Sequence, residues 1–264
     1  MKNITQNHHR KLHEDLKNRI NNTLMKTKLI VLTVLSIACF FSAHAQDNTL
    51  TQKEESAGWR LLFDGRTTIG WRGFQKSTLP EHGWAVEDGC LKCLGLKGGD
   101  IITTMTFTNF ELTWEWRLSP NGNSGVKYFV DEKRADPKGK LYSTAIAHEY
   151  QMIDDDNYSP PLSVKQKTGS FYEVITPQNA KPNPVGEFNQ SRLIVSGNKV
   201  EHWLNGKLVV SYQTTSAEVA AGIAASKFKN VPGFADKIPT PILLQDHNTI
   251  VWFRNLKLRN LPAQ

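Results

Sequence analysis

Three short stretches of the sequence carry side chains that could perform acid–base chemistry, namely Glu115 with Arg117, Glu149 with Gln151, and His202. A general base needs a pKa near the working pH, which an imidazole has and a desolvated carboxyl group acquires. Each stretch also has a plain structural explanation. Glu115 and Arg117 could form a solvated ion pair. His202 stands on an apolar strand face, where a histidine is more often a satisfied interior residue.

The elements that must position these side chains are β-strands. Residues 110–118 alternate, with Phe, Leu and Trp side chains on one face and Glu, Thr and Arg side chains on the other. A Gly- and Asn-rich run over 119–125 breaks this strand, and a second strand follows at 126–130. We expect the two to form an antiparallel pair. Residues 149–153 and 199–204 are further expected strands.

The same pattern extends over the rest of the chain. About a dozen short strands are separated by turn signals, such as Asp88-Gly89 and Asn205-Gly206, which are typical two-residue hairpin connections. No long amphipathic helix interrupts them, and only the Ala-rich stretch 217–228 is expected to form a short helix. The sequence therefore predicts an all-β fold, a sandwich or a barrel, as one domain over 58–261.

The chain before residue 58 is expected to stand apart from this domain. Residues 25–45 have the charged start, apolar run and small-residue cleavage site of a secretory signal peptide, with cleavage after Ala45. The stretch 1–24 is a polar leader, and we interpret Met25 as the true initiator. Residues 46–57 are polar and are expected to be a flexible linker. We therefore expect a periplasmic or secreted protein with no membrane span after removal of the signal.

Charge and cysteine content exclude some functions. The formal charge is +7, but of the 32 basic and 25 acidic residues, seven and two fall in 1–45, which leaves 25 against 23 elsewhere. The chain after residue 45 is nearly balanced in charge and has no basic stripe, so the sequence does not favour nucleic acid as a partner. Cys90 and Cys93 are three apart in an expected strand, so they point to opposite faces. No second cysteine pair is present to complete a zinc site.

A set of short motifs follows a fixed order along the domain. These are Leu62-Phe63-Asp64-Gly65, Trp84-x-Val86-x-Asp88-Gly89-x-Leu91, Asn109-Phe110-Glu111-Leu112-x-x-Glu115-Trp116-Arg117, Gly122-Asn123-Ser124-Gly125-Val126, Glu149-Tyr150-Gln151, Gly186-Glu187-Phe188-Asn189, His202-Trp203-Leu204-Asn205-Gly206 and Leu244-Gln245-Asp246-His247. No single motif is diagnostic, but in this order the sequence resembles the 3-keto-disaccharide hydrolase-like domain family over nearly all of 58–261. It departs from the family at Phe188, where Trp is usual, and at Ser170-Phe171.

This resemblance implies a concanavalin A-like jelly roll of two curved antiparallel sheets. It also implies a secreted or periplasmic protein that acts on glycosides oxidised at the third sugar carbon. A ketone there makes the hydrogen on the second carbon acidic, so a base can remove it and the group on the first carbon can leave by elimination. Hydration of the product then completes net cleavage. Such an enzyme needs one base, and a donor or cation at the enolate oxygen.

On this interpretation, Glu149 or His202 is the predicted base and Arg117 the predicted oxyanion partner. The predicted substrate-binding residues are Glu115, Asn123, Tyr128, Gln151, Asp154, Tyr172, Gln245 and His247. A divalent metal such as Ca or Mn could take the electrostatic role instead, with His202, Glu149 or Glu115 as ligands. The sequence leaves the metal open, because it contains no tight ligand spacing. These predictions require the charged groups to meet in one sugar-sized hollow of the curved sheet.

Two other functions are consistent with the sequence. One is a non-catalytic carbohydrate-binding module, because a fold alone does not give a function. The other is an ordinary retaining glycoside hydrolase, which needs two carboxyl groups about 5–5.5 Å apart. That enzyme would draw on the pattern Glu149-x-Gln151-x-x-Asp154, in which an amide occupies the middle position. A carbohydrate is the expected partner in each case, and the oligomeric state is not predicted.

Overall fold

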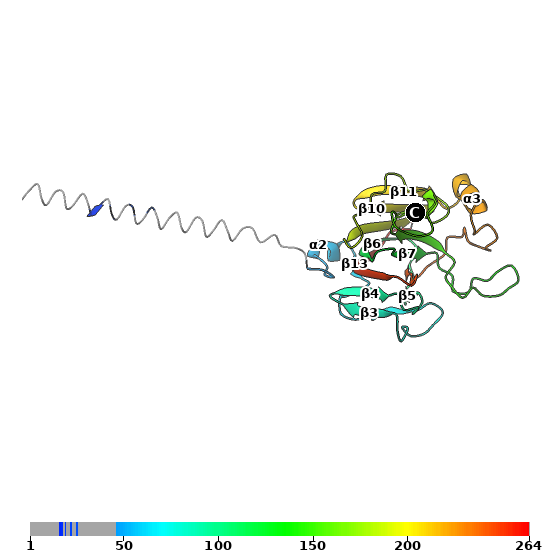
Figure 1. Ribbon diagram of the computed structural model, residues 1–264, viewed down its shortest axis with the longest axis horizontal. Helices are drawn as coiled ribbons and strands as arrows, with labels where there is room; N and C mark the ends of the chain where they lie inside the picture. The colour runs from blue at the N-terminus through cyan, green and yellow to red at the C-terminus, as the bar shows by residue number, and fades with distance from the viewer. Residues whose placement is uncertain (1–15, 18, 20–21, 23–24, 26–45, 264) are drawn as a thin grey trace, which may run out of the picture. The chain divides into compact units, whose positions relative to one another are not determined.

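The computed structural model describes residues 16–17, 19, 22, 25 and 46–263 (Figure 1). The expected signal peptide, apart from Met25, and most of the expected leader lie outside the described residues. The chain from Gln46 onward forms one compact unit. Among the described residues, no helix has the length and apolar character needed to cross a membrane.

Within residues 46–263, one sheet has eight strands. In the order in which they pair, these are β11 (Lys207–Gln213), β10 (Lys199–Leu204), β9 (Asn189–Ser196), β6 (Phe110–Leu118), β13 (Ile250–Asn260), β4 (Cys90–Leu94) and β3 (Trp84–Glu87), with β1 (Arg60–Leu61) paired to β13. All of these pairs are antiparallel. Strand β13 is the longest of the described strands and lies between β6 and β4, and its side chains largely alternate between buried and partly exposed.

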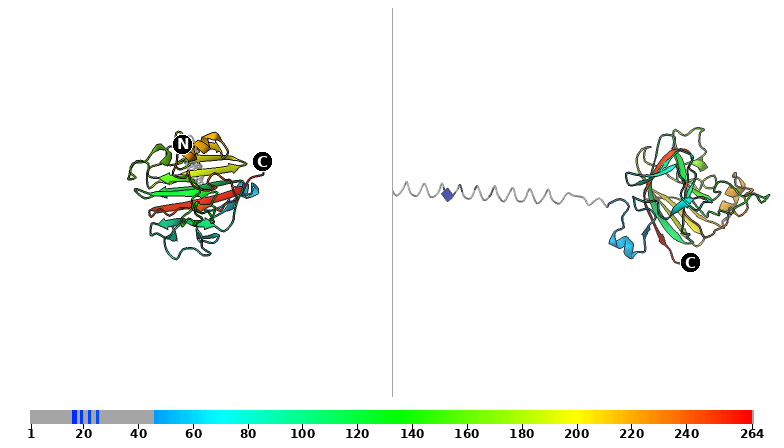
Figure 2. Two further views of the ribbon diagram at one scale, coloured as in Figure 1. Left: turned by 90° about the vertical axis from the view of Figure 1, so that its right-hand side faces the viewer. Right: turned by 90° about the horizontal axis from the view of Figure 1, so that it is seen from below.

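The second sheet of the described chain has five strands, in the order β2 (Trp71–Gly73), β5 (Ile101–Thr103), β12 (Leu243–Leu244), β7 (Asn123–Tyr128) and β8 (His148–Ile153). Short helices α2 (Gln52–Ser56), η1 (Val164–Gln166) and α3 (Ala217–Ala224) lie outside the sheets. Figure 2 shows the curved strands of the two sheets facing each other. The predicted all-β jelly-roll sandwich of two antiparallel sheets is confirmed.

The core lies between the sheets and is built by the alternation in β6. The apolar side chains of that strand are buried. Trp114 meets Tyr150 of β8 edge-on, with ring centroids 5.0 Å apart, and its Nε1 lies 3.4 Å from Met152 Sδ. These contacts show which face of each sheet is internal. Side chains on the opposite face of β8, and on the matching face of β7, point away from the larger sheet.

The expected pairing of the strand at 110–118 with the one that follows it is wrong. Strand β6 pairs with β9 and β13, whereas β7 pairs with β8 and β12 in the other sheet. The Gly-rich run between them therefore carries the chain from one sheet to the other instead of closing a hairpin. Asn121 takes a positive φ of 56°, and Gly122 packs so tightly on Leu118 that an added Cβ would lie 2.7 Å from its Cβ.

Residues 46–57, expected to be a flexible linker, differ from that expectation. Thr51 caps helix α2 and exchanges hydrogen bonds with Glu54 in a capping box. Asp47 Oδ2 lies 2.6 Å from Arg254 Nη1 on β13, and the Asn48 amide N–H donates to Asn255 Oδ1 at 2.6 Å. Polar composition is misleading here, because the segment is held by hydrogen bonds and charge rather than by apolar burial.

Candidate active site

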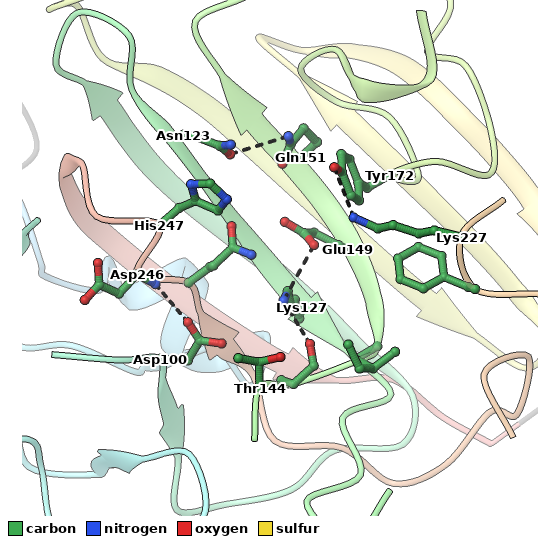
Figure 3. Close-up of a pocket in the computed structure, with 15 residues that line it drawn as sticks. Asp100, Asn123, Lys127, Thr144, Glu149, Gln151, Tyr172, Lys227, Asp246 and His247 are labelled. Atoms are coloured by element: carbon green, nitrogen blue, oxygen red, sulfur yellow. Dashed lines mark hydrogen bonds and ion pairs between the residues drawn. The ribbon is translucent and has the colours of Figure 1, made fainter. Parts of the chain in front are cut away.

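A pocket of about 290 Å³ lies on the outer face of the five-stranded sheet (Figure 3). Strands β7 and β8 form its floor, the chain before β5 and after β12 forms one side, and the segments around 144–147 and 227–228 form the others. It is lined by Asp100, Asn123, Lys127, Thr144, Ala145, Ile146, Ala147, Glu149, Gln151, Tyr172, Lys227, Phe228, Gln245, Asp246 and His247.

The centre of the pocket is an ion pair between neighbouring strands. Lys127 of β7 and Glu149 of β8 are directly opposite in the register, and Lys127 Nζ lies 3.7 Å from Glu149 Oε2. Both side chains are buried, at 8% and 7% exposure. Lys127 Nζ also donates to the carbonyl oxygen of Ala145 at 2.9 Å. A paired charge at this depth is held in place, because separating either partner would leave the other buried and uncompensated.

Two carboxamides complete the surroundings of Glu149. In the amide orientations that satisfy their neighbours, Gln151 and Gln245 each donate to Glu149 Oε1 at 3.3 Å. The oxygen of Gln245 then accepts from Lys127 Nζ at 3.2 Å, and the Gln151 amide also donates to Ser124 O at 3.0 Å. The Glu149 carboxylate thus faces two amides and one ammonium in a site largely shielded from water.

Burial changes the proton affinity of the pocket carboxyl groups. Loss of hydration raises the pKa of Glu149, and the positive charge of Lys127 opposes that rise. Burial likewise raises the pKa of Asp100, again against the charge of Lys127. Asp100 Oδ1 accepts from the backbone N–H of Asp246 at 3.0 Å. A carboxylate with a raised pKa is a stronger base than an ordinary one.

Aromatic residues and a second lysine form another side of the pocket. Lys227 Nζ lies 4.4 Å from the centre of the Tyr172 ring and donates to Tyr172 Oη at 3.3 Å. Burial, reinforced by the charge of Glu149, raises the pKa of Tyr172 to about 12. Figure 3 shows Lys127 and Lys227 approaching Glu149 from different sides. The carboxylate of Glu149 therefore has a lysine on each of two sides.

The structure brings together several of the residues predicted from the sequence. Glu149 lies in the pocket with Asn123, Gln151, Tyr172, Gln245 and His247. They converge because β7 and β8 are neighbours and alternate in phase, while the chain after β12 crosses the same end of the sheet. The roles given to them remain predictions.

His202, one of the two predicted bases, lies elsewhere. It points into the core, where Tyr128 Oη lies 2.7 Å from its Nε2 and the carbonyl of Gly169 lies 3.0 Å from its Nδ1. Burial lowers the pKa of His202 to about 4. Tyr128, predicted to bind substrate, is fully buried in the same network. The placement of both residues beside a sugar is therefore wrong, because their strands turn these positions inward.

Arg117 and Glu115 are also far from the predicted arrangement. They lie on the outer face of the larger sheet, where the Arg117 guanidinium sits between the rings of Trp252 and Phe188, at 4.4 and 5.0 Å. Glu115 Oε2 accepts from Arg254 Nε at 2.8 Å. The expectation that Arg117, Glu149 and His202 meet in one hollow is wrong, because β6, β8 and β10 present these side chains to three different environments.

Asp154 does not line the Glu149 pocket either. Its carboxylate accepts from the backbone N–H groups of Asn121 at 2.9 Å and of Asn157 at 3.1 Å, so it ties the end of β8 to two turns. The pattern Glu149-x-Gln151-x-x-Asp154 therefore does not place two carboxyl groups in this pocket. A retaining glycosidase mechanism that uses Glu149 and Asp154 as its two carboxylates is therefore not supported.

Four charged residues of the pocket were not among the predicted site residues: Lys127, Asp100, Lys227 and Asp246. Lys127 gave a usable signal, because it is a charged residue inside the expected strand 126–130, and Asp246 lies between the predicted residues Gln245 and His247. Asp100 and Lys227 gave none, since only the fold brings their segments to the same place. In the described part of the chain, no three His, Cys, Asp or Glu side chains are grouped so as to hold a metal ion. The suggested ligands His202, Glu149 and Glu115 are separated.

Comparisons with known proteins show the family to which this chain belongs. Residues 58–259 match the model of the 3-keto-alpha-glucoside-1,2-lyase-like domain. A 3-keto-disaccharide hydrolase of Bacteroides thetaiotaomicron is 34% identical over 249 residues, covering 82% of this chain and 83% of that protein. A crystal structure of a candidate glycosyl hydrolase from Parabacteroides distasonis superposes with a TM-score of 0.72 at 35% identity, covering 82% of this chain and all of that one.

A second protein of Parabacteroides distasonis, also described as a candidate glycosyl hydrolase, has 25% identity and a TM-score of 0.59, over 77% of this chain and 99% of that one. The family match covers most of the chain and, in the described part, includes both sheets except the last residue of β13. The chain therefore belongs to the family of 3-keto-alpha-glucoside-1,2-lyase-like domains.

Proposed function

We propose that this protein is an enzyme that cleaves 3-keto-glycosides, with Glu149 as the base that starts an elimination across the first and second sugar carbons. The observation that carries the proposal is the buried ion pair of Glu149 with Lys127 on the pocket floor. The family match and the relative named a 3-keto-disaccharide hydrolase support the substrate class.

The chemistry balances with this chain's own groups. Glu149 removes the proton from the second carbon, and the electron pair of that C–H bond moves toward the ketone to form an enolate. The enolate collapses, the C1–O bond breaks, and the leaving oxygen keeps the bonding pair and takes a proton. Water then adds across the C1–C2 double bond. Its oxygen bonds to the first carbon, the proton held by Glu149 passes to the second, and the proton that the water loses restores the acid that protonated the leaving oxygen, which gives the sum of hydrolysis. We assign to Tyr172, which lines the pocket, the role of supplying the proton to the leaving group.

Lys127 is the residue that would stabilise the negative charge during the reaction. Before reaction its ammonium faces the negative charge of Glu149, 3.7 Å away. When Glu149 accepts the proton, that negative charge disappears and an equal charge develops on the enolate oxygen. The Lys127 ammonium lies between the carboxylate and the enolate oxygen. When the carboxylate is neutralised, the ammonium can stabilise the charge on the enolate oxygen with little movement. The amides of Gln151 and Gln245 could supply further donors.

A non-catalytic sugar-binding module is the less favoured explanation. Such a module needs aromatic rings and amides in contact with the sugar, and the pocket has these in Tyr172, Gln151 and Gln245. It does not need a buried carboxylate of raised pKa or a buried ammonium, both of which cost free energy to desolvate. The Glu149–Lys127 pair therefore favours an enzyme.

The direct test is incubation of the protein with a 3-keto-disaccharide and with its unoxidised parent, with and without a chelator. We expect cleavage of the keto sugar only, transient formation of an unsaturated ketone, and incorporation of solvent deuterium at the second carbon. E149Q should lower the rate by several orders of magnitude. Cleavage of the parent sugar instead, or of neither sugar with binding retained, would contradict the proposal. Loss of activity with chelator alone would show that a divalent metal takes part.

We also propose that the protein is exported, on the basis of the signal-like sequence at 25–45 alone. N-terminal sequencing of the protein from a fractionated culture tests this. Recovery from the periplasm or medium with Gln46 as the first residue is expected. A cytoplasmic protein that begins at Met25 or earlier would contradict it.

A further inference from the structure

One side of the pocket is a segment fixed to the interior. We call residues 226–234 the pocket wall. The ring of Phe228 stacks on that of Phe234, with centroids 4.2 Å apart and planes at 12°. The carbonyl oxygen of Phe234 accepts from His148 Nε2 at 2.9 Å, in the core beneath β8. The wall therefore has a defined place relative to Glu149, although most of it lies outside both sheets.

Lys227 is the charged end of this wall beside the pocket. Its Nζ lies 4.4 Å from the centre of the Tyr172 ring and 5.3 Å from that of Phe228, and it donates to Tyr172 Oη. Cation–π contacts of this kind hold an ammonium over a ring without neutralising its charge. Lys227 is solvent-exposed, so a bound molecule can reach it.

The other principal charges of the pocket already have partners. Lys127 is paired with Glu149, and Asp246 accepts from two backbone N–H groups, at 3.0 and 2.9 Å. Asp100 accepts from the Asp246 backbone. In the part of the chain that the structure describes, no carboxylate forms an ion pair with Lys227. Its charge is therefore available to a ligand.

The geometry of a pyranose ring decides which part of a substrate meets Lys227. The second carbon lies between the ketone carbon and the carbon that bears the leaving group. With Glu149 at the second carbon and Lys127 at the ketone oxygen, the leaving group extends toward another side of Glu149. Tyr172 and Lys227 stand on such a side (Figure 3).

We infer that Lys227 selects substrates whose leaving group carries an anionic substituent, such as the carboxylate of a uronic acid. The inference rests on the proposed function, since it assigns the two sides of Glu149 from that reaction. A sulfate or phosphate ester would present the same charge and should be favoured in the same way. The unpaired ammonium would gain an ion pair with such a leaving group, and with a neutral one it would not.

The test uses two 3-keto-disaccharides that differ only at the sixth carbon of the leaving sugar, a hydroxymethyl group in one and a carboxylate in the other. For the natural protein we expect kcat/KM to favour the carboxylate about two- to fivefold at low salt, the size of a partly exposed ion pair. Added salt should reduce this preference. A sulfate ester in place of the carboxylate separates a response to charge from a response to carboxylate shape.

Three variants make the test specific. K227Q should abolish the preference, K227R should keep it, and K229Q should leave it as in the natural protein, because Lys229 is exposed two residues away and does not line the pocket. No preference in the natural protein, or an equal change for both substrates in K227Q, would overturn the inference.

Failure of the proposed reaction gives a different result. Neither disaccharide would then be cleaved, and the comparison moves to calorimetric binding of the unoxidised neutral and uronic acid disaccharides. Tighter binding of the uronic acid that K227Q removes would still support the role of Lys227. Equal binding of the two sugars would overturn it.

Discussion

Glu149 lies flat across Gly125 of the neighbouring strand. A Cβ built on Gly125 would stand 2.2 Å from Glu149 Oε1 and 2.8 Å from its Cδ, distances that atoms do not adopt. The absence of a side chain at position 125 therefore makes the space in which the carboxylate lies. The backbone of Gly125 is an ordinary part of β7, so the requirement is for space and not for an unusual φ.

This contact predicts the effect of Gly125→Ala. The added methyl group should push the Glu149 carboxylate off the strand and out of line with Lys127, lowering kcat by about a hundredfold, as misplaced catalytic groups do. Because the displaced group is a side chain, the variant should still fold. G73A on β2 is a matched control, since its Cβ would meet only the flexible Lys76 side chain. Undiminished activity of G125A would rule out the observed position of Glu149 as the active one.

The pH dependence of activity should reveal the pair of Glu149 and Lys127. Burial raises the pKa of Glu149, so the acid limb of kcat/KM should lie above the ordinary value of 4.5. Lys127 opposes that rise, so its removal should raise the pKa further and move the acid limb to higher pH. The measurement is the pH profile of K127Q beside K127R, which keeps the charge. A limb that stays in place in K127Q would show that Glu149 is not the titrating group.

Some of this site was readable in the sequence. The alternation over 149–153 put Glu149 and Gln151 on one polar face, and the structure has them there. The alternation around His202 equally placed it with Val200 and Leu204, and the structure buries all three. His202 is therefore a buried histidine with a hydrogen-bond partner at each ring nitrogen, which is the structural explanation given from the sequence.

What the sequence did not reveal depends on contacts between distant segments. Strand periodicity fixes which side chains share a face, but it does not specify which sheet a strand joins, so Arg117 was expected beside Glu149. Asp100 and Lys227 come from distant parts of the chain, and they meet at the pocket only because the fold brings the segment before β5 and the pocket wall to the same place. No local sequence pattern predicts such a contact between distant segments.

The two interior histidines predict sensitivity to acid. Burial lowers the pKa of His148 to about 3 and that of His202 to about 4, whereas in an unfolded chain both titrate near the ordinary value of 6.5. Between these values the unfolded state binds more protons, so the free energy of unfolding falls as the pH falls. Each histidine should lower it by about 2 kcal/mol between pH 7 and pH 5.

Urea denaturation at the two pH values measures this loss. H202Q should remove about half of it, because one of the two titrating groups is gone while its neighbour remains. The variant is expected to be less stable at pH 7, so the quantity compared is the difference between pH values and not the stability itself. An unchanged pH dependence in H202Q would mean that His202 does not titrate on unfolding.

The hydrogen bonds of these histidines predict their tautomers. A chain of five contacts, each 2.7–3.0 Å long, joins Gly169 O, His202, Tyr128, Tyr212, His148 and Phe234 O. A carbonyl oxygen only accepts, so His202 must carry its hydrogen on Nδ1 and His148 on Nε2. Two neutral histidines and two phenols then supply four hydrogens for five contacts. Nitrogen-15 spectra of the imidazoles should show these opposite tautomers near neutral pH, and equal tautomers would contradict this arrangement.

The bond from His148 to Phe234 predicts that a buried residue controls the pocket wall. Gln at position 148 can still donate to the Phe234 carbonyl through its terminal amide, whereas the shorter Asn leaves that carbonyl without its donor. H148N should therefore release Phe228 and Lys227, raising KM about tenfold while kcat changes less, and H148Q should stay near the natural value. Because His148 is neutral in the working range, neither variant should change the shape of the pH profile. An altered profile would indicate a direct role in proton transfer, and equal KM values in the two variants would show that this hydrogen bond does not hold the wall.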